Sequence, residues 1–233
     1  HHLVGHIYAN FLDGPPPEWP AVCLVVSGGH TDLLYVDERG AVSCVGRTRD
    51  DAAGEAFDKV ARLLGLPYPG GPALEALARG AEPGGVVFPR ALLEPGTYDF
   101  SFSGLKTAVA VYLERQRAAG REPPLASVAA AFQQAVVEVL TVKAVGAAVA
   151  LGVPRLLLGG GVAANRALRE ALAAAAREAG VELRVPPPRY CTDNAAMIAC
   201  AGYYAWKAGR ADGADLDAAA RLPLADVLPA GRG

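Results

Sequence analysis

The sequence predicts an α/β fold built on a mixed sheet, because strand-like and helix-like segments follow one another in a distinctive order. Three short strands separated by turns occupy residues 21–47, and connections this short join antiparallel neighbours. A strand–helix–strand–helix series fills residues 155–207, and such a series pairs its strands in parallel through right-handed crossovers. Three antiparallel strands, a mostly helical insertion and then β-α-β-α form the ribonuclease-H-like topology of an actin-like ATPase (ASKHA) lobe.

The spacing of apolar residues predicts where each helix and strand lies. Helices are expected where apolar residues recur at intervals of three and four, as Phe57, Val60, Ala61 and Leu64 do. Strands are expected where β-branched and leucine residues run between polar turns. In chain order, these signals predict a helix at 1–12, strands at 22–26, 33–36 and 42–45, helices at 50–64, 73–78, 105–119 and 125–151, a strand at 155–158, a helix at 164–179, a strand at 182–185 and a last helix ending near Lys207.

Composition places the chain among folded globular proteins. Of its 233 residues, 52% are hydrophobic and 20% are charged, a balance that excludes a disordered chain. The net charge of −2 excludes a protein coated with positive charge for nucleic acid, although a local patch or a partner subunit can still attract RNA. Four cysteines without a C-x-x-C pair indicate reduced thiols. No signal peptide or transmembrane helix is indicated, so we expect a cytoplasmic protein with no membrane partner.

Polar, glycine-rich turns follow strands that this topology brings to one edge of the sheet. Ser27-Gly28-Gly29 follows the first strand, three glycines at 159–161 follow the fourth, and Thr192-Asp193 precedes the last helix. By itself, the first turn is typical of a hairpin after a core strand. Ligands of such sheets bind outside the carboxyl ends of the strands. Three such turns at one edge therefore favour a ligand site, where backbone N–H groups can hold phosphate oxygens.

Two histidines and a carboxylate form a candidate metal site. His2 and His6 lie four residues apart, so a helix projects both imidazoles to one side, although histidines at the start of a chain are also typical of a tag. Asp193 is either a third ligand or a plain helix cap. Two histidines and a carboxylate suit Fe(II) or Zn(II). No glutamate lies between the histidines, so the general base of a zinc peptidase is absent.

Two further polar residues have both a structural and a functional interpretation. Asp58 lies beside the buried stripe of its helix, and it either pairs locally at the surface or accepts hydrogen bonds from ligand hydroxyls. Asn165 follows a strand–glycine–helix junction that suits a nucleotide, and it either contacts the base or ribose or caps the helix. The spacing of the glycines is not G-x-G-x-x-G, which disfavours a dinucleotide-binding fold.

Six motifs resemble, in order and at fitting spacings, those of the tRNA threonylcarbamoyladenosine transferase family, formerly called O-sialoglycoprotein endopeptidase or glycoprotease. The resemblance covers nearly the whole chain, and the six motifs together are highly specific. They are VSGGHT at 26–31, DDAAGEAFDK at 50–59, YPGGP at 68–72, FSFSGLKT at 100–107, GGVAAN at 160–165 and CTDN at 191–194.

The resemblance implies a transfer reaction on RNA. Members of this family move a threonylcarbamoyl group from threonylcarbamoyl-AMP to the N6 amine of adenosine 37 in tRNAs that read ANN codons. Carried over by motif, His2, His6 and Asp193 would hold one divalent metal per subunit, Fe(II) or else Zn(II). The adenylate would contact Val25, Val26, Ser27, Gly28, Gly29, Asp58, Gly71 and Asn165. No general base is assigned. The implied partners are tRNA, a paralogous subunit and a small ATPase of the same complex.

The resemblance also implies a division of the chain. Residues 1–14 would be a hinge helix carrying the histidine pair, 20–66 with 125–225 the actin-like lobe, and 67–124 an insertion within it. Relatives have a further lobe before the histidine pair, and Val4 stands where many of them have glutamate. Because the adenylate would lie between the two lobes, we expect this chain to fold but to have little or no transferase activity alone.

Three other functions remain open. The paired histidines and the older family name suggest a metal-dependent glycoprotein endopeptidase, which the missing glutamate argues against. The topology suggests an actin-like kinase or ATPase, but a fold does not settle function. A non-catalytic subunit of the complex is the third alternative, and the presence of all three candidate metal ligands argues against it.

Overall fold

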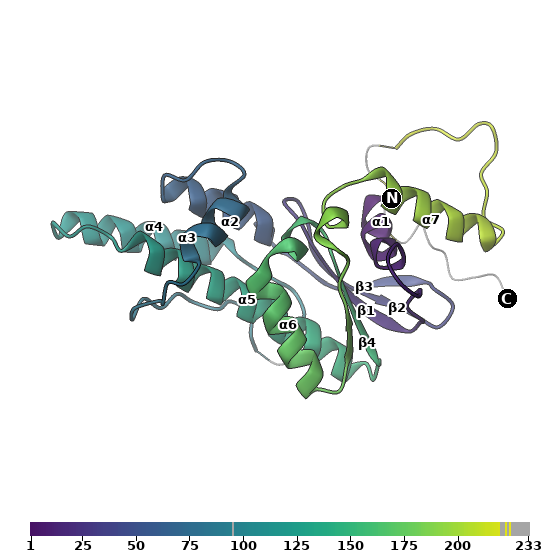
Figure 1. Ribbon diagram of the computed structural model, residues 1–233, viewed down its shortest axis with the longest axis horizontal. Coiled ribbons are helices and arrows are strands. Elements are labelled where there is room, and N and C mark those ends of the chain that lie inside the picture. Colours follow the sequence, from purple (N-terminus) through teal and green to yellow (C-terminus); the bar gives the residue numbers. More distant parts are fainter. Residues whose placement is uncertain (95, 220–221, 223, 225–233) are drawn as a thin grey trace.

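A five-stranded mixed sheet lies at the centre of the computed structural model, which describes residues 1–94, 96–219, 222 and 224 (Figure 1). The strand order is β3-β2-β1-β4-β5. The β1–β2 and β2–β3 pairs are antiparallel, whereas β1–β4 and β4–β5 are parallel. The strands are β1 Ala21–Val26, β2 Thr31–Val36, β3 Val42–Arg47, β4 Arg155–Gly159 and β5 Glu182–Arg184. The predicted topology is therefore confirmed.

Helices cover both faces of this sheet, and the alternation of side chains along β1 divides the core between them. Val22, Leu24 and Val26 pack with the helices from α2 to α6, whereas the residues that alternate with them pack with α1 and α7. All six residues of β1 are buried, as expected of a central strand covered on both faces. The helices are α1 His2–Tyr8, α2 Ala53–Leu63, α3 Gly70–Ala78, α4 Ser103–Ala118, α5 Leu125–Ala150, α6 Arg166–Glu178 and α7 Ala195–Lys207, with 3₁₀ turns η1 Ala9–Phe11, η2 Gly161–Ala164 and η3 Pro188–Tyr190.

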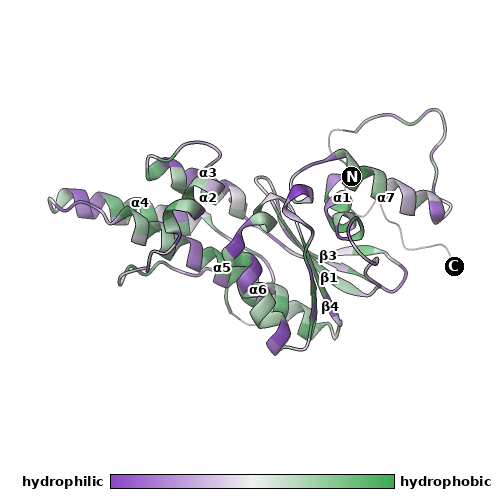
Figure 2. Cartoon of the chain, viewed as in Figure 1, coloured by the Kyte–Doolittle hydropathy of each residue, from purple (hydrophilic) through white to green (hydrophobic). Residues whose placement is uncertain are grey.

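The long helix α5 forms the middle of the larger core cluster. By length and apolar composition it is the one helix in the described part of the chain that is able to cross a membrane. However, 61% of its most apolar stretch is buried inside the protein, and Phe132 stacks edge to face on Phe57 of α2 at 5.2 Å between ring centroids. The apolar residues of α5 therefore belong to the core of the protein. In Figure 2, much of α5 has the green colour of hydrophobic residues.

Helices α3 and α4 extend the larger cluster beyond the sheet. α3 packs against α2 and α5, and α4 packs against α2, so that α2, α3 and α4 lie together at the end of the molecule opposite α7 (Figure 1). The division into 1–14, the lobe 20–66 with 125–225, and the insertion 67–124 stays a prediction. Of these, residues 95, 220, 221, 223 and 225 lie outside the described residues.

Helix α2 begins at Ala53 and not at Asp50, so the expectation that Asp50 and Asp51 open this helix is wrong. The N–H group of Ala53 is instead bound by the Oγ1 atom of Thr31, at 2.9 Å. Thr31 is fully buried at the start of β2, 22 residues before the helix that it caps. The two aspartates are thereby free to contact the insertion.

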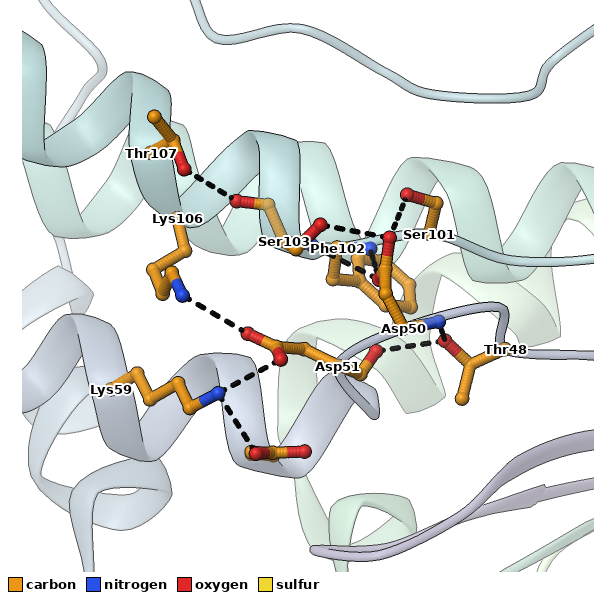
Figure 3. Close-up of polar contacts among 10 residues, drawn as sticks. Thr48, Asp50, Asp51, Lys59, Ser101, Phe102, Ser103, Lys106 and Thr107 are labelled. Atoms are coloured by element: carbon orange, nitrogen blue, oxygen red, sulfur yellow. Dashed lines mark hydrogen bonds and ion pairs between the residues drawn. The ribbon is translucent and has the colours of Figure 1, made fainter.

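Asp50 caps α4 (Figure 3). Its carboxylate accepts hydrogen bonds from the N–H groups of Phe102 (2.8 Å) and Ser103 (3.1 Å) and from the hydroxyls of Ser101 and Ser103. Burial disfavours the charged form, but the hydrogen bonds outweigh this effect and lower the pKa of Asp50 to about 2. The segment before α2 therefore fixes the first turn of a helix that begins 53 residues later in the sequence.

Two glycines at the carboxyl end of β4, Gly159 and Gly160, lie very close to neighbouring backbone atoms. Gly160 has a φ angle of +89°, and a Cβ atom there would overlap the carbonyl oxygen of Val26 at the end of β1. Gly159 lies close to α1, since a Cβ atom there would lie 2.8 Å from the carbonyl oxygen of His6. A side chain at either position would push β4 away from its neighbours.

We predict that Gly160→Ala lowers the free energy of unfolding by about 2–4 kcal/mol, because both the positive φ and the overlap with Val26 oppose a side chain. Gly161→Ala is the matched control, since its Cβ would meet nothing closer than Thr192 Cγ2 at 3.7 Å and should cost less than about 0.5 kcal/mol. Urea unfolding followed by circular dichroism measures both. Equal losses in the two variants would contradict the packing described here.

We also predict that Asp50→Asn destabilises the protein by about 1 kcal/mol at neutral pH, as loss of a helix cap does. The folded-state pKa of Asp50, about 2, lies below the ordinary value of 3.8, so its stabilising charge is fully present above about pH 4. That contribution disappears as the pH falls towards 2. The difference in urea midpoint between wild type and Asp50→Asn should therefore shrink with acidity, whereas Glu114→Gln, the same charge change on α4, should have no effect at either pH.

Candidate functional site

The turn Ser27–His30 connects β1 to β2 and is stabilised by its own serine. Ser27 Oγ accepts hydrogen bonds from the N–H groups of His30 (3.1 Å) and Gly29 (3.4 Å), and the Ser27 N–H donates to the His30 carbonyl oxygen (2.8 Å). Gly28 and Gly29 are exposed, and no described atom lies within 4 Å of where their Cβ atoms would be. The segment is thus a hairpin turn whose glycine backbone is open to solvent at the carboxyl end of β1.

The N-terminus of α2 packs directly on this turn. The N–H group of Gly54 donates to the carbonyl oxygen of Ser27 at 3.1 Å, and a Cβ at Gly54 would lie 2.5 Å from the same oxygen. The N–H group of Ala53 also donates to the Oγ1 atom of Thr31. The first residues of α2 are therefore hydrogen-bonded both to the turn after β1 and to the start of β2. The positive end of the α2 dipole therefore lies beside the open glycines.

His6 and Asp193 meet at the same edge of the sheet. The His6 Nε2 atom lies 3.1 Å from the Asp193 Oδ1 atom. Asp193 is available because the next residue, Asn194, is the cap of α7: its Oδ1 accepts the Met197 N–H at 2.9 Å. The alternative that Asp193 is a plain helix cap is therefore wrong. The Asp193 side chain is 78% exposed, whereas that of His6 is only 2% exposed.

His2 makes a different contact. Its Nε2 atom lies 3.4 Å from the Nδ1 atom of His30, and the centroids of the His2 and His6 rings are 6.2 Å apart. Burial lowers the pKa of His2, and His30 lowers it further. Burial also lowers the pKa of His6, although Asp193 partly offsets this effect. Both imidazoles therefore favour the neutral form, which is the form that binds a metal.

His2 pairs with His30, and His6 pairs with Asp193, so these four side chains do not form a single metal-binding centre. Within residues 1–94, 96–219, 222 and 224, no three His, Cys, Asp or Glu side chains surround a common metal position. The donor chemistry nevertheless fits a divalent ion, since the Nε2 atom of His6 and a carboxylate oxygen of Asp193 lie 3.1 Å apart and both atoms are of types that bind such ions. For a three-ligand site, His2 has to leave His30 and join His6 and Asp193.

Two of the predicted ligand-binding residues already serve a structural purpose. Asp58 Oδ1 accepts the N–H of Gly70 at 2.8 Å and so fixes the start of α3. Asn165 caps α6, where its Oδ1 accepts the Leu168 N–H at 2.9 Å and its Nδ2 donates to Gln133 at 2.9 Å. The capping interpretation of Asn165 is confirmed, and its contact with a nucleotide stays a prediction.

The other predicted ligand-binding residues differ in accessibility. The side chains of Val25 and Val26 are buried on opposite faces of the sheet, so only their backbone is able to face a ligand. At Gly71 no described atom lies within 4 Å of a Cβ position.

His30 is not among the metal ligands predicted from the sequence, and its contact with His2 joins residues 28 apart in sequence. Its place directly after the glycine pair is the sequence signal that points to it.

Comparison with known proteins identifies the family. A family model described as TsaD, tRNA N6-adenosine threonylcarbamoyltransferase, matches residues 1–200. A curated relative of that name from Symbiobacterium thermophilum is 59% identical and is matched over 96% of this chain and 65% of its own length. Another from Moorella thermoacetica is 55% identical, over 96% of this chain and 66% of its own length. The chain thus spans just under two-thirds of the length of these relatives.

Solved structures agree on the fold. Full-length HypF in its phosphate- and nucleotide-bound form has a TM-score of 0.64 at 16% identity, covering 86% of this chain and 34% of that one. The activator of 2-hydroxyisocaproyl-CoA dehydratase from Clostridium difficile, with bound ADPNP, has a TM-score of 0.51 at 17% identity, covering 91% and 70%. At such identities the likeness concerns the fold alone, and it confirms the actin-like α/β class. Because the family model covers most of the chain and these curated relatives share more than half of the aligned residues, the chain belongs to the tRNA N6-adenosine threonylcarbamoyltransferase family.

Proposed function

We propose that this chain transfers a threonylcarbamoyl group from threonylcarbamoyl-AMP to the N6 amine of adenosine 37 in tRNAs that read ANN codons. The observation that carries the proposal is the placement, in a member of this family, of the open glycine turn and the His6–Asp193 pair at one edge of the sheet. The pair offers metal donors, and the turn offers unhindered backbone N–H groups for a phosphate.

A divalent metal, which membership of the family suggests in general, belongs to this proposal. His2, His6 and Asp193 would hold it, and we propose Fe(II), with Zn(II) as the alternative that the same donors accept. A divalent ion held there would supply Lewis-acid stabilisation of negative charge on the oxygens of the adenylate. Burial lowers the pKa of His2 and of His6 and so favours the neutral imidazoles that bind a metal.

The backbone of Val25 to Gly29 would hold the phosphate of the adenylate. The N–H groups of Gly28 and Gly29 are unhindered, and the N-terminus of α2 adds its dipole as negative charge develops on the departing AMP. The mixed anhydride is already activated, so positioning contributes more than a strong base, and we assign no general base. Asp58 keeps one oxygen, Oδ2, that accepts no hydrogen bond within the described residues, and Gly71 and Asn165 complete the nucleotide side.

We further propose the cytoplasm as the location and three macromolecular partners: tRNA, a paralogous subunit and a small ATPase. A net charge of −2 supports the need for a local basic surface or a basic partner, because the RNA backbone is strongly negative.

We predict that His6→Ala and Asp193→Ala each weaken binding of Zn(II), or of Fe(II) without oxygen, by at least about tenfold, because each removes a ligand. Isothermal titration calorimetry and metal analysis after dialysis provide the readout. Asp212→Ala is the matched control for Asp193→Ala, since Asp212 is an exposed aspartate that is not among the proposed ligands. Wild-type affinity in both ligand variants would overturn the metal assignment.

We also predict metal-dependent modification of tRNA when threonylcarbamoyl-AMP is supplied. The chain is tested alone and also joined to the remaining segment of the relative from Symbiobacterium thermophilum, with the modified nucleoside quantified by mass spectrometry. We expect the joined protein to be active and His6→Ala to reduce its rate at least about a hundredfold. If neither form modifies tRNA, the proposed reaction is wrong. If His6→Ala is as active as the wild-type protein, the proposed metal site is wrong.

A further inference from the structure

A groove of about 320 Å³ lies between α2 and α4 and has a cationic lining. Three of its residues come from each helix. Leu63 and Ala110 give it a partly apolar floor, and Thr107 is the remaining neutral residue. The other three residues, Lys59, Arg62 and Lys106, are all positively charged at neutral pH.

The carboxylates around this groove only partly neutralise it. Lys59 Nζ lies 2.8 Å from both Asp51 Oδ1 and Glu55 Oε1, so this cation is fully paired. Lys106 Nζ is 3.5 Å from Asp51 Oδ2, a looser contact (Figure 3). Arg62 is exposed, and within residues 1–94, 96–219, 222 and 224 its guanidinium makes no ion pair or hydrogen bond. Arg62 and Lys106 are therefore the charges that remain available to a ligand.

Asp51 links the two helices that form the walls of the groove, α2 and α4. Asp51 is only 14% exposed and lies between the two lysines, one from each helix, as Figure 3 shows. Asp50 caps the first turn of α4 immediately beside it. The spacing of Lys59 and Lys106 is thus set before any ligand arrives, which lowers the entropic cost of binding.

The groove also lies close to the open glycine turn along the same helix. Gly54 of α2 contacts Ser27, and Lys59 and Arg62 follow it by five and eight residues. At 1.5 Å per residue, these cations lie roughly 8 and 12 Å farther along the helix axis. A polymer whose reacting nucleotide reaches the turn has its neighbouring phosphates within range of these side chains.

We propose that the α2–α4 groove binds the phosphodiester backbone of the RNA substrate on one flank of the reacting adenosine, an inference that rests on the proposed function. Surface cations along an open groove suit a polyanion, whereas a single small phosphate needs several converging and less exposed donors. The apolar floor of Leu63 and Ala110 accommodates ribose or base faces between phosphates. The groove thus supplies a local positive surface in a chain of net charge −2.

The test measures binding of a fluorescent RNA hairpin, carrying an ANN-reading anticodon loop, to the 233-residue chain by anisotropy at several salt concentrations. We expect Arg62→Gln and Lys106→Gln each to weaken binding by about two- to fivefold at low salt, and each to reduce the slope of log K against log salt by about 1. Lys106→Arg keeps the charge and should bind as wild type. Arg177→Gln, an exposed arginine in the last turn of α6, is the matched control for a general change of charge.

Three results would contradict RNA binding in the groove. They are wild-type affinity and salt slope in the double variant Arg62→Gln/Lys106→Gln, an equal loss of RNA affinity in Arg177→Gln, and displacement of the hairpin by inorganic phosphate at matched ionic strength. Binding of an acidic peptide in preference to the hairpin would also overturn it. The proposed function is tested separately by metal affinity. Groove variants that bind RNA normally, together with loss of metal in His6→Ala, would disprove the groove and leave the proposed function standing.

Discussion

The contact between the carboxyl ends of β1 and β4 is the constraint on which the candidate site depends. Gly160 lies against the carbonyl oxygen of Val26, and Gly159 lies against the carbonyl oxygen of His6. These close approaches bring three separate pieces of chain to one edge of the sheet: the open turn after β1, the junction after β4, and α1 with its histidines. Neither approach leaves room for a Cβ atom, so the edge exists in this form only with glycine at both positions.

Helix caps from distant segments complete this edge. Thr31 of β2 binds the first N–H of α2, and Asp50 binds the first turn of α4. Asn165 and Asn194 cap α6 and α7 from the residue directly before each helix. Because Asn194 makes the capping hydrogen bond of α7, the carboxylate of Asp193 remains free to face His6 at the candidate metal site.

The paired aspartates before α2 combine mechanical and electrostatic effects. Asp50 fixes α4, and Asp51 holds a lysine from each of the two facing helices. The same arrangement that joins α4 to α2 therefore shapes a cationic groove beside the turn. In a chain with almost balanced charge, such a local arrangement and not the overall composition determines where a polyanion is attracted.

The topology could be predicted from the sequence, because strand and helix periodicity are local signals and the order of elements then leaves few ways to pair the strands. The same topology also brings Ser27-Gly28-Gly29 and Asp193 to one edge of the sheet, whereas the place of His6 at that edge comes from the packing of α1 against Gly159. Three contacts could not be predicted in this way: Asp50 caps α4, His2 contacts His30, and Asn194 rather than Asp193 caps α7. The first two contacts join residues 52 and 28 apart, and the third is a choice between adjacent residues with equal capping tendency. No local pattern encodes such contacts, since they depend on how packed helices orient their ends.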